Sequence, residues 1–188
     1  MKQKLLIFLG IIILSTPLAT KAATNFVQTS SMNVNVSRTG PATLLAEGNV
    51  MVAGGSVAQS PYCTAGVELY NPTTESWITA ASLNTGRFNH TATLLPNDKV
   101  LVVGGDGSTP WLASAELYDP ISQQWGYTGA LNIGRELHTA TLLPHGKVLV
   151  VGGYNNGNLA SSELYDLATG LWSHVGSLKT ARYGHTAT

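Results

Sequence analysis

One unit of sequence is copied along this chain at an interval of 47 or 48 residues. Residues 87–125 read RFNHTATLLPNDKVLVVGG, then a loop, then SAELYDP and a tryptophan, and residues 135–172 repeat the same order. The repeated tryptophans are spaced by 48 and then 47 residues, at Trp77, Trp125 and Trp172. A period near 50 residues is typical of radial arrays of small β-sheets, in which each unit buries its faces only by stacking on its neighbours.

Within one unit the pattern predicts four antiparallel strands. Residues 90–95 alternate polar and apolar side chains and end at a tight turn, which indicates a first strand and its hairpin. Residues 100–103 are all apolar, as expected for a second strand covered on both faces. Residues 114–118 alternate again, and 123–127 surround a tryptophan at the outer edge. Four such strands form one blade of a propeller.

The residues that recur in every unit are interpreted as a structural frame. They are Gly54, Gly55, Glu68, Tyr70, Trp77, Arg87, His90, Gly104, Gly105, Glu116, Tyr118, Trp125, Arg135, His138, Gly152, Gly153, Glu163, Tyr165, Trp172, Arg182 and His185. The paired glycines permit a positive φ or a close backbone approach. We expect arginine and glutamate, which are sparse charges here, to pair within or between blades on partial burial. For His90, His138 and His185 alone, the alternative to a structural role is that they hold a metal ion.

This unit resembles the Kelch repeat family, whose blade carries a diglycine after the second strand, then a tyrosine and a tryptophan. Gly104 and Gly105, Tyr118 and Trp125 are those residues in one unit, and the flanking units match in the same way. The resemblance implies an all-β propeller of four-stranded blades that serves as a binding platform. Similar repeats also form the scaffold of galactose oxidase, a copper radical enzyme.

The ends of the array hold incomplete units. We expect three complete four-stranded blades between a lone N-terminal strand of fourth-strand type and a lone C-terminal strand of first-strand type. The expected segments are a signal peptide (1–22), the lone N-terminal strand (23–37), Kelch repeats 1 (38–86), 2 (87–134) and 3 (135–181), and the start of repeat 4 (182–188). A truncated gene product or a fragment explains the open ends. Self-assembly is the alternative. However, a dimer would place a first strand beside a fourth strand, and these two strands are not neighbours within a blade.

The N-terminus predicts export. Two lysines lead into the apolar run 5–14, and a small-residue segment follows, as in a secretory signal peptide. Ten apolar residues are too few to span a bilayer, which needs about 20. Without residues 1–22, seven basic residues face ten acidic ones, which disfavours nucleic acid as a partner. The sequence therefore predicts a secreted, periplasmic or cell-surface protein with no stable membrane anchor after cleavage.

The loops between second and third strands vary from unit to unit and are the expected binding surface. In an antiparallel blade these loops and the inter-blade linkers emerge on the same face. The candidate ligand-binding residues in them are Tyr62, Asp106, Trp111, Tyr154, Asn155 and Asn156. Aromatic rings could stack on a sugar or hold a peptide, with the polar residues as partners. Packing on their own loop is the alternative for these side chains.

Catalysis finds little support in the sequence. No Ser, His and Asp grouping stands apart from the repeated frame, and Cys63 is the single cysteine. Cys63 beside Tyr62 does not reproduce the cofactor of galactose oxidase, and a free cysteine in a variable loop suggests an incidental surface position or a thiol that pairs with another chain. We expect a binding module for a protein or carbohydrate ligand, with no catalytic residue, cofactor or metal. The alternatives are a fragment of a copper oxidase and a non-functional truncated reading frame.

Overall fold

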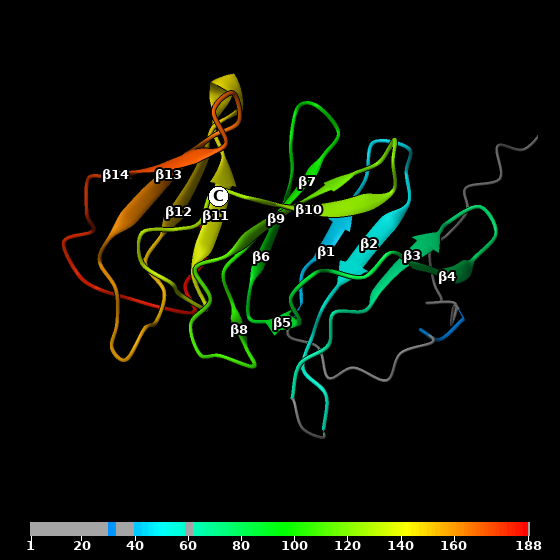
Figure 1. The fold of residues 1–188 in the computed structure, drawn as a ribbon, viewed down its shortest axis with the longest axis horizontal. Coiled ribbons are helices and arrows are strands. Elements are labelled where there is room, and N and C mark those ends of the chain that lie inside the picture. Colours follow the sequence, from blue (N-terminus) through cyan, green and yellow to red (C-terminus); the bar gives the residue numbers. More distant parts are fainter. Residues whose placement is uncertain (1–29, 33–39, 59–61, 188) are drawn as a thin grey trace, which may run out of the picture.

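The computed structural model describes residues 30–32, 40–58 and 62–187, and it folds into three four-stranded antiparallel sheets (Figure 1). Blade 1 consists of β1 (Ala42–Leu44), β2 (Val50–Ala53), β3 (Val67–Asn71) and β4 (Ser76–Ala80). Blade 2 consists of β6 (Thr91–Leu94), β7 (Val100–Val103), β9 (Ala115–Asp119) and β10 (Gln124–Thr128). Blade 3 consists of β11 (Thr139–Leu142), β12 (Val148–Val151), β13 (Ser162–Asp166) and β14 (Leu171–Val175).

Each blade is a simple meander, and the three blades lie side by side in chain order (Figure 1). The first strands β1, β6 and β11 contact one another in a row, so they form the inner side of the array. A short ladder pairs β5 (Arg87–Phe88) with β8 (Asp106–Gly107), and a 3-10 turn, η1 (Pro144–Gly146), joins β11 to β12. The architecture confirms the expected all-β propeller portion with three complete four-stranded blades.

The structure describes the C-terminal segment 182–187, but only residues 30–32 of the N-terminal segment 1–37. The expected signal peptide and most of the expected lone N-terminal strand lie outside the described residues. The expected C-terminal strand is not present, because residues 182–187 are assigned to no strand. A strand needs a ladder partner, and the described residues supply none to this segment. No helix in the described part of the chain is long and apolar enough to cross a membrane.

The apolar core lies between the blades rather than within any one of them. Val100, Val102 and Tyr118 of blade 2 pack with Met51 and Val67 of blade 1, and the residues involved are nearly all fully buried. The opposite face of the same β7 strand packs on blade 3 in the same manner. Strand β7 is therefore buried on both sides, which explains why its four residues are all apolar.

The paired glycines make the close approach between blades possible. The amide of Gly105 donates to the carbonyl of Arg135 in the next unit at 2.8 Å. Gly104 has φ +62°, and a Cβ on it would lie 2.5 Å from the same carbonyl oxygen. A side chain at this position is therefore excluded by both conformation and contact.

The tryptophans join the outer edges of consecutive blades. Trp125 Nε1 donates to the carbonyl of Ala81 at 2.9 Å, and Trp172 Nε1 donates to that of Gly129 at 2.8 Å. Trp77 makes the same kind of bond to Ser30 at 3.0 Å, so this N-terminal residue takes the place of a preceding blade's linker. Each indole thus fixes its blade to the linker that comes before it.

Candidate functional site

Each fully described unit contains a buried arginine–glutamate pair that supports the loops. Arg135 Nη2 lies 2.8 Å from Glu163 Oε1, and Arg87 Nη2 lies 2.8 Å from Glu116 Oε1. All four side chains are fully buried. Arg135 also donates from Nη1 to the carbonyls of Gly152 and Ser161. Because every donor has a partner, the pair can be held in a dry interior.

The glutamates also hold the linker that arrives from the preceding blade. Glu163 accepts hydrogen bonds from the amide and side chain of Asn132, at 2.7 and 2.8 Å, and from the amide of Ile133 at 3.1 Å. Glu116 accepts the same three bonds from Asn84 and Thr85. The repeated glutamate therefore fixes the inter-blade linker as well as its own arginine, a role that the sequence did not indicate.

The repeated histidines form a line across the blades. Thr91 Oγ1 lies 2.9 Å from His138 Nε2, and Thr139 Oγ1 lies 3.2 Å from His185 Nε2. Burial, and next the charge of Arg135, lowers the pKa of His138 to about 3, so the ring is neutral near neutral pH. The described residues contain no group of three or more His, Cys, Asp or Glu side chains arranged to hold a metal ion.

His90 differs from the other two histidines in its neighbour. Its Nε2 is buried and, unlike Nε2 of His138 and His185, contacts no threonine hydroxyl among the described residues. Residue 91 pairs with Val103 and residue 42 with Val52, which puts Pro41 in blade 1 at the place of Thr91. Proline has no hydroxyl, so the contact that serves His138 and His185 is lost at the first interface.

The loops between second and third strands and the inter-blade linkers come together on one surface, here called the loop face. It consists of residues 62–65 with 84–86, 106–113 with 132–134, and 154–160 with 179–181. Backbone bonds join each loop to its linker, as between Arg135 N and the Leu112 carbonyl at 3.2 Å and between Arg182 N and the Leu159 carbonyl at 3.0 Å. The loops are therefore fixed to the frame of the propeller.

A row of aromatic side chains crosses the loop face. The ring centroids of Trp111 and Tyr154 are 6.3 Å apart, and those of Tyr154 and Tyr183 are 5.5 Å apart. These residues come from three consecutive units, so the rings pack across blades and not on their own loops. Trp111 has φ +51°, in the left-handed region that disfavours a bulky residue, so its loop holds it in a strained conformation.

The other candidate residues take different places. Asn155 is next to the aromatic row and donates from Nδ2 to the Gly134 carbonyl at 2.6 Å. Asn156 is exposed, and Asp106 lies in β8, where its carboxylate accepts a bond from the amide of Gly107. Tyr62 is 61% exposed and has no ring contact with another described aromatic residue, so it is not part of the row.

Tyr183 and Glu136 belong to this surface and were missed by the sequence reasoning. Both follow a repeated arginine, at the position that Phe88 occupies in the second unit. Glu136 forms a β-bridge with Tyr154, and its Oε2 accepts a hydrogen bond from Asn89 Nδ2 at 2.8 Å. The signal that could have found them is variation: three different residues follow the same invariant arginine.

The structure corrects the expectation for Cys63. Its side chain is buried, with 7% exposure, although it lies in a variable loop. A Cβ on Gly86 would be 3.2 Å from Cys63 Sγ, so the thiol packs on the linker between blades 1 and 2. The loop folds inward here because Thr64 N donates to the Gly55 carbonyl at 2.9 Å. Cys63 is therefore a packing residue and not an incidental surface thiol, whereas the adjacent Tyr62 is exposed.

Comparison with known proteins agrees with this architecture. The family model described as Kelch motif matches residues 87–125 and 138–179. A solved structure described as "Structure of YjhT" superposes with a TM-score of 0.64 at 18% sequence identity, over 77% of this chain and 53% of that one. The present chain thus spans about half the length of that protein, and at this identity the likeness shows the fold alone. No curated protein matches the chain.

Proposed function

Because the chain belongs to the Kelch repeat family and presents an aromatic row on its loop face, we propose that it is a binding module for a protein or carbohydrate ligand, without catalysis of its own. The observation that carries the proposal is the contact of Trp111, Tyr154 and Tyr183 across three units. These residues lie outside the repeated frame, so blade geometry does not account for them.

The chemistry of the row suits ligands that offer apolar faces together with hydroxyl or amide groups. Aromatic side chains supply a large contact area, and tyrosine and tryptophan also carry a polar group at their edge. Tyr183 is 50% exposed and Trp111 is partly exposed, so part of each ring is accessible. Asn156 and Asn158 are exposed beside them and provide amide donors and acceptors.

Rigid support favours recognition by this surface. The linkers of the loop face are held by buried carboxylates, and the loops are held by the linkers through backbone bonds. Preorganisation lowers the entropy that a ligand must overcome when it binds. Loops placed on a rigid scaffold are also the usual location of binding residues.

We also propose that the protein is exported, on the basis of the lysines and apolar run of residues 1–22. Expression of the full chain in a bacterial host, followed by mass spectrometry of its N-terminus, tests this point. Cleavage near Ala22 supports export. A mature protein that begins at Met1 and stays in the cytoplasm contradicts it.

The binding proposal is tested with soluble protein on a glycan array and against immobilised peptides. We expect Trp111→Ala to weaken binding of any ligand found by about tenfold or more, because one buried aromatic anchor contributes this much at an interface. Tyr62→Ala is the matched control, since it removes an exposed aromatic ring from another loop. Equal binding by Trp111→Ala and the unchanged protein would contradict a site at the row.

A further inference from the structure

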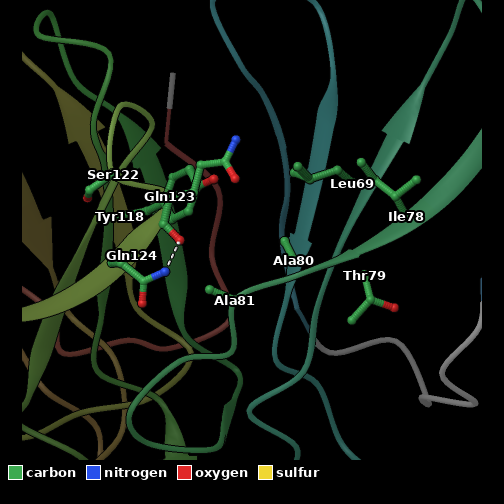
Figure 2. Close-up of a pocket in the computed structure, with 9 residues that line it drawn as sticks. All are labelled: Leu69, Ile78, Thr79, Ala80, Ala81, Tyr118, Ser122, Gln123 and Gln124. Atoms are coloured by element: carbon green, nitrogen blue, oxygen red, sulfur yellow. Dashed lines mark hydrogen bonds between the residues drawn. The ribbon is translucent and has the colours of Figure 1, made fainter.

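A cleft opens at the outer rim between blades 1 and 2, and none of the residues that line it belongs to the loop face (Figure 2). It has a volume of about 250 Å³ and lies between the end of β4 and the turn that joins β9 to β10. The residues that line it are Leu69, Ile78, Thr79, Ala80, Ala81, Tyr118, Ser122, Gln123 and Gln124. None of these side chains is charged. Burial, and next the charges of Glu47 and Asp119, raise the pKa of the Tyr118 hydroxyl, and these nearby carboxylates disfavour an anion, so the cleft suits a neutral ligand.

The corresponding junction between blades 2 and 3 is closed, because backbone and side-chain contacts join the two blade edges there. Gly129 N donates to the Gly170 carbonyl at 3.0 Å, and Thr128 Oγ1 lies 2.8 Å from the hydroxyl of Tyr165. The approach depends on Gly129, because a Cβ there would overlap the Gly170 carbonyl oxygen. The hydroxyl of Thr128 is also 3.4 Å from that oxygen.

The first junction carries different residues at these places. Counted from the repeated tryptophans, Ala80 and Ala81 replace Thr128 and Gly129, and Gln123 replaces Gly170. The methyl group of Ala81 prevents the close approach that Gly129 allows, so the two blade edges stay apart. The polar contacts of the closed junction are lost together with it.

Two polar groups in the cleft are consequently available to a ligand. Tyr118 corresponds to Tyr165, but its hydroxyl has no hydrogen-bond partner among the described residues. The Gln123 carbonyl accepts a single bond, from its neighbour Gln124 Nε2 at 3.0 Å (Figure 2), whereas the corresponding Gly170 carbonyl accepts two. A ligand hydroxyl at the position of the Thr128 hydroxyl could bond both groups, as Thr128 does in the closed junction.

The opposite wall of the cleft is apolar. Leu69 and Ile78 are a cross-strand pair of β3 and β4, and Ile78 is 54% exposed. The residues that correspond to Ile78 in the other blades are Gly126 and Ser173, so this side chain is not required by the repeat. An apolar wall opposite hydroxyl-bonding groups matches the two faces of a sugar ring. The volume lies just below the range of about 300–1,000 Å³ typical for small-molecule sites, which limits the ligand to about one ring.

We propose that this rim cleft binds a neutral monosaccharide, with the Tyr118 hydroxyl and the Gln123 carbonyl as its polar anchors and Ile78 against its apolar face. The site is separate from the loop face, so it goes beyond the proposed function and does not depend on it.

The test is ligand-observed saturation-transfer NMR and titration calorimetry on the full chain with glucose, galactose, mannose and N-acetylglucosamine as probes. We expect at least one of these sugars to bind. Tyr118→Phe should weaken that binding by about threefold to tenfold, because one hydroxyl hydrogen bond is lost. The thermal midpoint should hardly change in this variant, since the removed hydroxyl has no protein partner and the ring remains.

Tyr165→Phe is the matched control, because it removes the hydroxyl at the closed junction, where it bonds Thr128. It should lower stability and leave sugar binding unchanged. A second variant, Ala80→Thr with Ala81→Gly and Gln123→Gly, gives the first junction the residues of the closed one and should abolish binding while the protein stays folded. The proposal is overturned if none of the four sugars binds, or if Tyr118→Phe and the triple variant bind as the unchanged protein does. Trp111→Ala, which tests the loop face, should not affect this site.

Discussion

The guanidinium of Arg135 and the carboxylate of Glu163 meet at 2.8 Å in a position where neither side chain is exposed to solvent. The same contact, with the same distance, joins Arg87 to Glu116 one unit earlier. In each case the carboxylate also holds the linker from the preceding blade. In each of these units the buried glutamate thus links its own strand to the arginine of the same unit and to the linker from the preceding blade.

Replacement of Arg135 by methionine should destabilise the fold strongly. The change leaves the Glu163 carboxylate buried without its cation, and breaking one side of a buried pair costs about 3–5 kcal/mol of unfolding free energy. Urea unfolding followed by tryptophan fluorescence measures the loss. Lys147→Met is the control in the same blade, because it breaks the partly exposed pair of Lys147 and Asp166. It should cost much less, because solvent screens an exposed ion pair. Similar losses in the two variants would contradict the importance of the buried pair.

Gly129→Ala should weaken the junction of blades 2 and 3. Its Cβ would overlap the Gly170 carbonyl oxygen, which forces the blade edges apart, and overpacking of this kind costs about 1–3 kcal/mol. Gly126→Ala, in strand β10 just before Gly129, serves as the control, since a Cβ at Gly126 meets nothing within 4 Å. Calorimetric thermal midpoints separate the two. If both substitutions leave the midpoint unchanged, the backbone contact at Gly129 is unimportant.

Stability should fall as the solution becomes acidic. Burial, and then the charges of Arg87 and Arg135 respectively, lower the pKa values of His90 and His138 to about 3. The unfolded chain takes up these protons from about pH 6.5 downward, whereas the folded protein does not. Between about pH 6.5 and about pH 3 each histidine therefore lowers the unfolding free energy by up to about 1.4 kcal/mol for every pH unit of acidification. The loss is complete below the folded pKa and absent above the unfolded one.

Urea unfolding between about pH 7 and about pH 5.5 measures this dependence above the titration range of ordinary carboxylates. His138→Gln should have a shallower slope of stability against pH, because glutamine takes up no proton. His145→Gln is the control, since His145 is exposed in the β11–β12 turn. The same slope in His138→Gln and the unchanged protein would show that the buried histidine does not control the acid sensitivity.

Cys63 should react slowly with thiol reagents in the folded protein. Burial, and next the charge of Asp106, raise the pKa of its thiol, so less of the reactive thiolate is present. Ellman's reagent in native buffer and in guanidinium chloride gives the comparison. Slow reaction in buffer and fast reaction after unfolding is the expected result. Rapid reaction under native conditions would instead place the thiol at the surface.

Internal repetition made much of this fold predictable. A residue that recurs at the same place in every unit, such as Gly104 or Trp125, reports a requirement of the blade itself. The structure shows that requirement as a carbonyl in contact with the glycine and another bonded to the indole. The same logic fails where residues vary, because a variable position is compatible with function, with packing or with neither. Cys63 and Tyr62 are adjacent variable residues, yet one is buried and the other exposed.

The sequence by itself determined the blade: the period, the order of its strands and the residues common to all copies, because these depend on local pattern and on repetition. Only the tertiary structure decided how one copy meets the next, since the contacts between blades join residues about 30 to 50 positions apart. Where two blade edges approach closely in space, a single methyl group can separate them. Ala81 and Gly129 occupy the same place in their units, and the difference of one carbon between them coincides with an open cleft in one junction and a closed contact in the other.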